Sequence, residues 1–108
     1  MKHALFLVLA FSTASALAAD APAYSNLKGW ISDSKCGAKH AGSGSDCVRK
    51  CVAGGDSPVF VDEATRKVWA IDDPRVVMRN LGQHVAVVAS SDSAKNSVHV
   101  LRVTVMPN

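Results

Sequence analysis

Short apolar runs alternate with polar, turn-forming segments along most of the chain, and this pattern predicts five β-strands. The expected strands cover residues 27–32, 59–61, 67–71, 84–89 and 97–106. In the last of them, Val98 and Val100 share one phase of the two-residue repeat. The other phase is shared by Leu101, Val103 and Val105. The change of phase at Val100–Leu101 predicts a bulge or a sharp coil, which a small curved barrel needs.

Two short helices are expected between these strands. Asp46 is the predicted N-cap of a helix that runs from Cys47 to about Val52, and Gly54-Gly55 is the predicted end of that helix. Asp73-Pro74 is typical of a second helix start, with an N-cap residue followed by proline at the first helical position. Gly82 is a natural residue to follow the end of that second helix.

The order of these elements predicts the fold class. A short, mainly β chain with five strands and a helix before the fourth matches a small OB-like barrel. The alternative is an open five-stranded sheet with one helix packed on it. We therefore expect a mainly β fold with one or two short helices. It would form a single domain over residues 27–107, with a Cys/His-rich insert at residues 33–55.

The N-terminal segment has the features of a Sec signal peptide over residues 1–18. Lys2 supplies a positive charge, Ala4 to Phe11 form an apolar run, and Ala16-Leu17-Ala18 fits an A-x-A cleavage site. The apolar run is too short to cross a bilayer, and no second run is longer. Residues 19–26 then form a flexible lead-in. The predicted location is periplasmic or secreted.

Charge and compartment narrow the classes of function. Removal of Lys2 with the signal peptide lowers the formal net charge from +3 to +2. This charge is too small to indicate binding to nucleic acid or to an anionic membrane. Export places the three cysteines in an oxidising compartment, where disulfides are the usual state of cysteine pairs.

All three cysteines and one histidine gather in the pattern Cys36-x3-His40-x6-Cys47-x3-Cys51. Three thiols and an imidazole make a Cys3His set, which suits tetrahedral zinc. Copper(I) also favours thiolates. On the expected helix, Cys47 and Cys51 lie four residues apart on one face, close enough to share an ion. Cys36, His40, Cys47 and Cys51 are therefore candidate ligands for zinc or copper.

A disulfide is the competing interpretation of the same segment. Cys47 and Cys51 on one helical turn are poorly placed for each other, because a disulfide needs Cβ atoms about 3.5–4.5 Å apart. Cys36 would then pair with Cys47 or Cys51, and the third thiol would be left free or buried. A redox enzyme is less favoured, since the chain has no C-x-x-C motif and no thioredoxin-like βαβ pattern.

The cysteine segment and its flanks also resemble a family of small exported bacterial proteins, a domain of unknown function numbered 5818. The shared residues are Gly29-Trp30-Ile31-Ser32-Asp33-Ser34-x-Cys36-Gly37, then His40, Cys47, Cys51 and Gly54-Gly55 before an apolar strand. Residues 81–87 are similar to the L-x-G-x-x-V-x-V element of such proteins, with a spacing one residue shorter. The resemblance implies export and a small β-rich domain, and it implies no particular activity.

These observations predict a binding or structural module and not an enzyme. The chain has no G-x-S-x-G, no phosphate-binding loop and no H-E-x-x-H. The Cys/His-rich segment would act as a disulfide staple; the alternative function is a periplasmic metal-binding protein with a Cys3His site. The expected partner is an unidentified protein, glycan or envelope ligand bound on the barrel face.

Overall fold

The structure is a computed structural model that describes residues 23–107. The predicted signal peptide, residues 1–18, and the first half of the predicted lead-in, residues 19–22, lie outside the described residues. The end of the lead-in is described, and there the prediction was wrong: Ser25 and Asn26 already belong to the first strand. This strand pairs from Ser25 onward because Ala89 of a later strand lies opposite.

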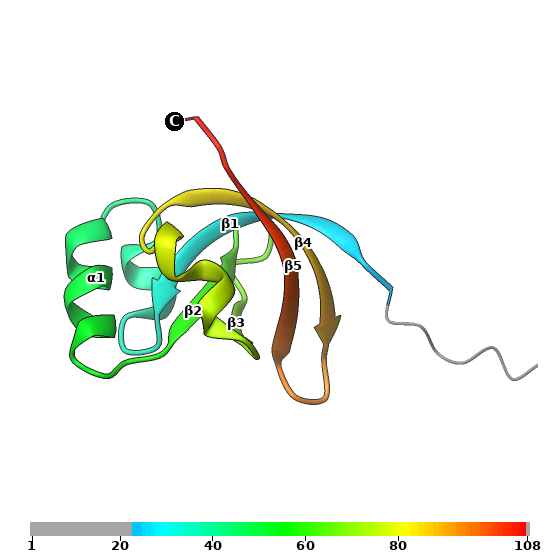
Figure 1. The fold of residues 1–108 in the computed structure, drawn as a ribbon, viewed down its shortest axis with the longest axis horizontal. Coiled ribbons are helices and arrows are strands. Elements are labelled where there is room, and N and C mark those ends of the chain that lie inside the picture. Colours follow the sequence, from blue (N-terminus) through cyan, green and yellow to red (C-terminus); the bar gives the residue numbers. More distant parts are fainter. Residues whose placement is uncertain (1–22, 108) are drawn as a thin grey trace, which may run out of the picture.

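The described chain contains five strands, one α-helix and two 3-10 helices (Figure 1). They follow one another as β1 (Ser25–Asp33), η1 (Gly37–His40), α1 (Ser45–Ala53), β2 (Pro58–Asp62), β3 (Val68–Ile71), η2 (Pro74–Asn80), β4 (His84–Asp92) and β5 (Ser97–Val105). No helix within residues 23–107 is long and apolar enough to cross a membrane.

The strands form one sheet that closes in a ring in the order β1-β2-β3-β5-β4. β1 pairs in antiparallel fashion with β2 and also with β4, the last strand in this order. The pairing of β1 with β4 closes the ring. β3 and β5 pair in parallel, and the remaining neighbours are antiparallel. The predicted class, mainly β with five strands and short helices, is confirmed. The closed ring agrees with the barrel prediction, and the packed helix agrees with the alternative.

A bulge in β5 lets the long β4–β5 ribbon curve into this ring. Val88 lies opposite Arg102, but the next residue, Ala89, lies opposite Val100. Leu101 is therefore the extra residue on β5, and its side chain is half-exposed. The predicted irregularity at Val100–Leu101 is confirmed, since an inserted residue reverses which phase of the strand faces inward.

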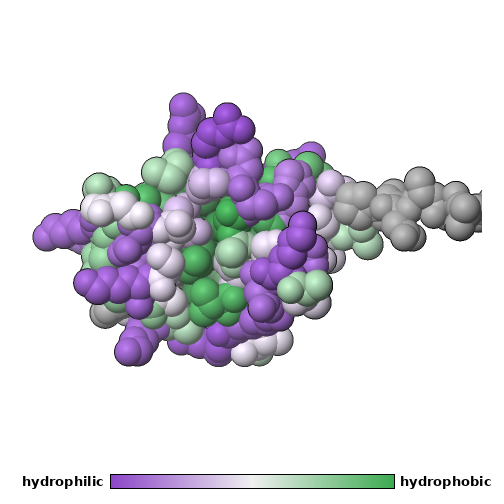
Figure 2. Space-filling view, turned by 90° about the horizontal axis from the view of Figure 1, so that it is seen from below, coloured by the Kyte–Doolittle hydropathy of each residue, from purple (hydrophilic) through white to green (hydrophobic). Residues whose placement is uncertain are grey.

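The core fills the inside of the ring with side chains from alternate strand positions. Its fully buried members include Ile31, Phe60, Val85, Val87 and Val98. Val48 from α1 and Val77 from η2 belong to the same cluster, so both helices pack on the sheet. On the face in Figure 2, hydrophilic side chains surround a central group of apolar ones.

The helix α1 lies beyond the end of β1 (Figure 1). The predicted N-cap, Asp46, was wrong, because the helix begins at Ser45 and Gly44 occupies the cap without a side-chain bond. Asp46 instead lies in the first turn and forms an exposed ion pair with Arg49. A Cβ added to Gly82 would come within 2.4 Å of Ser45, so the helix start packs directly on the chain before β4.

The second helix follows its sequence signals closely. The carboxylate of Asp73 accepts a hydrogen bond from the Arg75 backbone N–H, and Pro74 occupies the first turn. Gly82, just beyond the helix, has a φ of +76°, which glycine adopts without strain. Its N–H donates to the Ile31 carbonyl at 2.7 Å, which ties this turn to β1.

Candidate functional site

Asp33 is a buried acidic residue at the last position of β1. Its side chain is 0% exposed. The Oδ1 atom accepts hydrogen bonds from the backbone N–H groups of Lys35, at 3.0 Å, and Cys36, at 2.9 Å. This local arrangement is typical of aspartate at the start of a turn. It directs the chain out of the strand and places Cys36 beside the carboxyl group.

The second carboxyl oxygen of Asp33, Oδ2, is buried and has no hydrogen-bond partner among the described residues. A buried polar atom without a partner costs about 1–3 kcal/mol, and more when it carries charge. Such an atom is uncommon in a folded protein and calls for a specific explanation. The surroundings of Oδ2 therefore define the candidate site.

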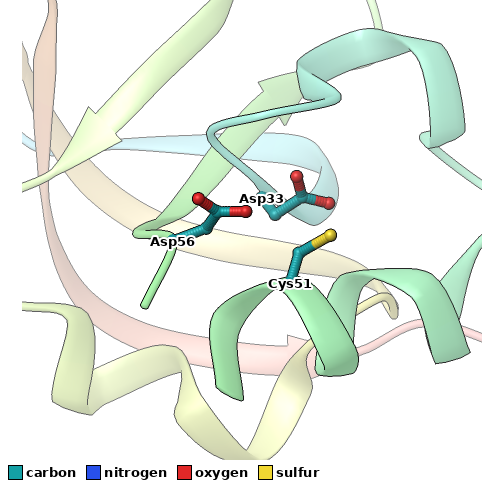
Figure 3. A group of neighbouring side chains, drawn as sticks. All are labelled: Asp33, Cys51 and Asp56. Atoms are coloured by element: carbon teal, nitrogen blue, oxygen red, sulfur yellow. The ribbon is translucent and has the colours of Figure 1, made fainter. Parts of the chain in front are cut away.

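Cys51 and Asp56 face the same space as Asp33 (Figure 3). One ligand atom from each residue lies within 4.8 Å of the other two. Backbone contacts hold this arrangement: the N–H of Asp56 donates to the Cys51 carbonyl at 3.0 Å. The next residue, Ser57, exchanges hydrogen bonds with Ser34, which fixes the loop to the turn after β1.

The other two thiols lie next to this group. Cys47 precedes Cys51 by one helical turn on α1, and the two cysteines approach to 4.0 Å. Cys47 also helps to raise the pKa of both Cys36 and Cys51, which places it near the two other thiols.

The structure describes the side chains of some predicted ligands but not of all. Cys47 lies near Cys36 and Cys51, and the assignment of the three thiols as metal ligands stays a prediction. His40 is the last residue of η1, but its side chain lies outside the described part of the structure. The structure adds Asp33 and Asp56, which the sequence prediction did not include as ligands.

The cluster disfavours thiolates in the absence of a cation. Partial burial is the largest cause that raises the pKa of Cys51, to about 11, and the Cys47 thiol and the negative charge of Asp33 add to it. Partial burial and the charge of Asp33 also raise the pKa of Cys36, while Lys35 opposes this change. A cation among these groups would reverse the balance, because positive charge stabilises thiolate and carboxylate.

The donor set suits a borderline-soft metal ion. Zinc binds thiolates at about 2.3 Å and carboxylate oxygens at about 2.0–2.2 Å, so tetrahedral ligand atoms lie about 3.3–3.8 Å apart. The group formed by Asp33, Cys51 and Asp56 is within 4.8 Å, and Cys47 is 4.0 Å from Cys51. A contraction of about 1.0–1.5 Å would bring Asp33, Cys51 and Asp56 to the distances that zinc needs, and Cys47, which lies outside this group, would have to move toward the two carboxylates to become the fourth ligand.

No two cysteines lie at disulfide distance in residues 23–107, which include all three. The structure therefore presents the cluster as three thiols. The predicted disulfide staple, Cys36 with Cys47 or with Cys51, stays a prediction.

Asp33 and Asp56 differ in the sequence signal that they carry. Asp33 ends an alternating strand three residues before Cys36, and this spacing is typical of a turn that an aspartate stabilises. Asp56 follows Gly54-Gly55 in a loop and has no local signal. Its approach to Asp33 depends on the pairing of β1 with β2.

A second polar region lies beside Trp30. The Trp30 and His84 rings stack with centroids 5.1 Å apart, and His84 Nε2 lies 2.8 Å from a Glu63 carboxylate oxygen. A cavity of about 360 Å³ adjoins them, lined also by Ser43, Arg49 and Gln83. Its walls offer several hydrogen-bond donors.

Comparisons of the chain with family models, with curated proteins and with solved structures gave no match. The resemblance to the exported family numbered 5818 therefore stays a prediction.

Proposed function

We propose that this chain is an exported β-barrel domain that binds one zinc ion through Asp33, Cys47, Cys51 and Asp56. The observation that carries the proposal is the buried carboxyl group of Asp33, which faces Cys51 and Asp56 and whose Oδ2 atom has no hydrogen-bond partner among the described residues. A bound cation would supply the missing partner of Oδ2. It would also offset the repulsion among two carboxylates and two thiolates.

Zinc fits the mixed donors better than copper does. Thiolates together with carboxylates suit a borderline ion, whereas copper(I) selects thiolate ligands alone. Copper(I) would instead use the three thiols of Cys36, Cys47 and Cys51. The predicted Cys3His set, with His40, is the arrangement that this proposal modifies.

The expected role of the ion is structural. It would join the end of β1, the helix α1 and the loop before β2, and would add to the hydrogen bonds and to the packing of Val48 that already connect them. A domain of this size has a small hydrophobic core, and metal binding adds directly to its folding free energy. The ion would therefore replace, in the reduced protein, the staple that a disulfide would provide.

Metal analysis of protein purified without chelator, with a free-thiol count on the same sample, tests the proposal. We expect about one equivalent of zinc and three free thiols in the unfolded protein, of which two, Cys47 and Cys51, become reactive in the folded protein when the metal is removed. Asp33→Asn should lower the zinc content, whereas Asp46→Asn, which changes an exposed carboxylate on the helix that carries Cys51, should leave it unchanged. Metal-free protein that takes up no added zinc in reducing buffer would contradict the proposal.

The cavity beside Trp30 favours a second function, the binding of an envelope glycan or protein on the barrel face. The supporting observation is the group of donors from Ser43, Arg49 and Gln83 around one cavity. Nuclear magnetic resonance with soluble glycan fragments tests it. The indole N–H of Trp30 should shift, while that of the buried Trp69 should not. Equal shifts at both indoles, or none, would count against this site.

A further inference from the structure

The second half of β5 carries three apolar side chains in one phase of the strand, Leu101, Val103 and Val105. Val103 packs against the core, but Leu101 and Val105 are 54% and 51% exposed, so a large part of each side chain is uncovered. In Figure 1 this end of β5 projects beyond the ring toward the C-terminus. Scattered apolar residues are common on protein surfaces, so these two need a second observation, which the backbone supplies.

The backbone of the same segment has one open edge. β3 pairs with only the first two residues of β5, so beyond the bulge β4 is the one neighbouring strand of β5 among the described residues. The N–H of Met106 donates to the His84 carbonyl at 2.9 Å, and hydrogen-bonded pairs alternate along an antiparallel ladder. The N–H and carbonyl groups of Val103 and Val105 therefore point away from β4, and they have no backbone partner within residues 23–107.

We propose that this edge of β5 pairs with the same edge of a second copy of the chain, antiparallel about a two-fold axis at Val103. An unpaired strand edge with apolar side chains is a template for another strand, and many proteins block it with charges, proline or a covering segment. Residues 101–105 contain no proline and a single charged residue, Arg102. This inference is independent of the zinc site and goes beyond the proposed function.

The segment is complementary to itself in this register. A two-fold axis at Val103 sets Leu101 opposite Val105 of the second copy. It also sets Arg102 opposite Thr104, so no two like charges face each other. Directly opposed apolar side chains stabilise a strand pair. Val103 forms a hydrogen-bonded pair with its counterpart, because its N–H and its carbonyl both face the open edge.

A second copy is the occupant that this pattern favours. Because the apolar residues are placed symmetrically about Val103, one segment supplies both halves of a two-fold interface. The neighbouring register, centred on Thr104, would set Pro107 opposite Leu101, and proline has no N–H to donate. Pairing about Val103 extends the sheet from β4 and β5 of one copy into β5 and β4 of the other. The contact is small, so the dimer should be reversible.

Sedimentation velocity over a series of protein concentrations measures the association, in reducing buffer so that thiols do not cross-link the chains. Wild-type protein should shift reversibly from monomer to dimer. Leu101→Lys and Val105→Glu should each weaken the dimer at least about tenfold, because each places two charges against apolar side chains. Val68→Lys is the matched control. Val68 is 39% exposed on β3, outside this edge, so the variant should dimerise as wild type does.

An equimolar mixture of the two charged variants tests the register itself. In a mixed dimer, the new lysine at position 101 of one copy faces the new glutamate at position 105 of the other. The second pair in that dimer keeps the wild-type Leu101 and Val105. The mixture should therefore dimerise about threefold or more strongly than either variant alone, because directly opposed residues of opposite charge attract.

Three results would overturn the inference. One is wild-type protein that stays monomeric at millimolar concentration, which would leave the edge to an extended strand of another protein. Another is a dimer that neither charged variant weakens, and the third is a mixture that dimerises no better than its components. If a charged variant does not fold, Val105→Pro replaces it. The Val105 N–H faces away from β4, so its loss should disrupt the dimer and leave the monomer folded.

Discussion

The carboxyl group of Asp33 and the thiol of Cys51 lie within 4.8 Å of each other, although one ends a strand and the other belongs to a helix. The contact brings an ionisable sulfur against a buried carboxyl group whose Oδ2 has no hydrogen-bond partner within residues 23–107. A neutral interior disfavours such a pair, and a cation between the two groups stabilises it.

Asp33→Asn should separate the metal-binding role of this residue from its structural role. At zinc concentrations about 100-fold above Kd, wild type should gain about 2.7 kcal/mol, which raises Tm by about 10–20 °C. The variant should lose most of this gain. Without zinc it should melt at or above the wild-type temperature, because a neutral amide costs less to bury than a carboxylate. Thermal unfolding with zinc or with chelator measures both effects.

Asp46→Asn is the matched control for that experiment, since Asp46 is an exposed carboxylate on the helix that carries Cys51. It should respond to zinc as wild type does. An Asp33→Asn protein that is destabilised in chelator but still gains the full zinc shift would show that Asp33 acts only through its turn.

The reduced, metal-free protein should lose stability as the pH rises above 9. The folded state raises the pKa of Cys51 from 9.0 to about 11, so it holds the thiol proton more tightly than the unfolded state does. This contribution is fully present below pH 9 and is lost between pH 9 and about 11. Thermal unfolding in reductant and chelator at a series of pH values measures the slope. Cys51→Ser should flatten it, and an unchanged slope in that variant would refute the assignment.

Val48→Ala should loosen the helix that carries two of the proposed ligands. Val48 is 1% exposed and joins α1 to the core inside the ring. Loss of its methyl groups should cost about 2 kcal/mol and should also weaken zinc binding. Urea unfolding measures the first effect. Val76→Ala, on the exposed side of η2, should change stability by less than about 0.5 kcal/mol.

Gly29→Ala should disrupt the pairing of β1 with β2. A Cβ at Gly29 would lie 1.9 Å from the Val61 carbonyl oxygen, which is backbone and has no room to move within the sheet. We expect a loss of at least about 3 kcal/mol. Gly54→Ala is the control, because its nearest contact would be 3.4 Å, and its stability should stay within about 0.5 kcal/mol of wild type. Equal urea midpoints for the two variants would contradict this account.

Local patterns predicted the strands well, because alternation of side chains is a property of each strand alone. The change of phase at Val100–Leu101 even located the bulge in β5. The start of α1 was less predictable. Asp46 and Gly44 are both acceptable caps by local rules, and the close packing of Ser45 on Gly82 accompanies the earlier start.

The sequence by itself determined the number and order of the strands and the grouping of three cysteines in one segment. Only the tertiary structure decided which side chains face a common point. Asp33 is buried at the end of β1 that lies next to α1, and Asp56 reaches it because β2 pairs with that strand. Contacts of this kind join residues that are distant along the chain. They depend on how the sheet closes and how α1 packs, which no local repeat encodes.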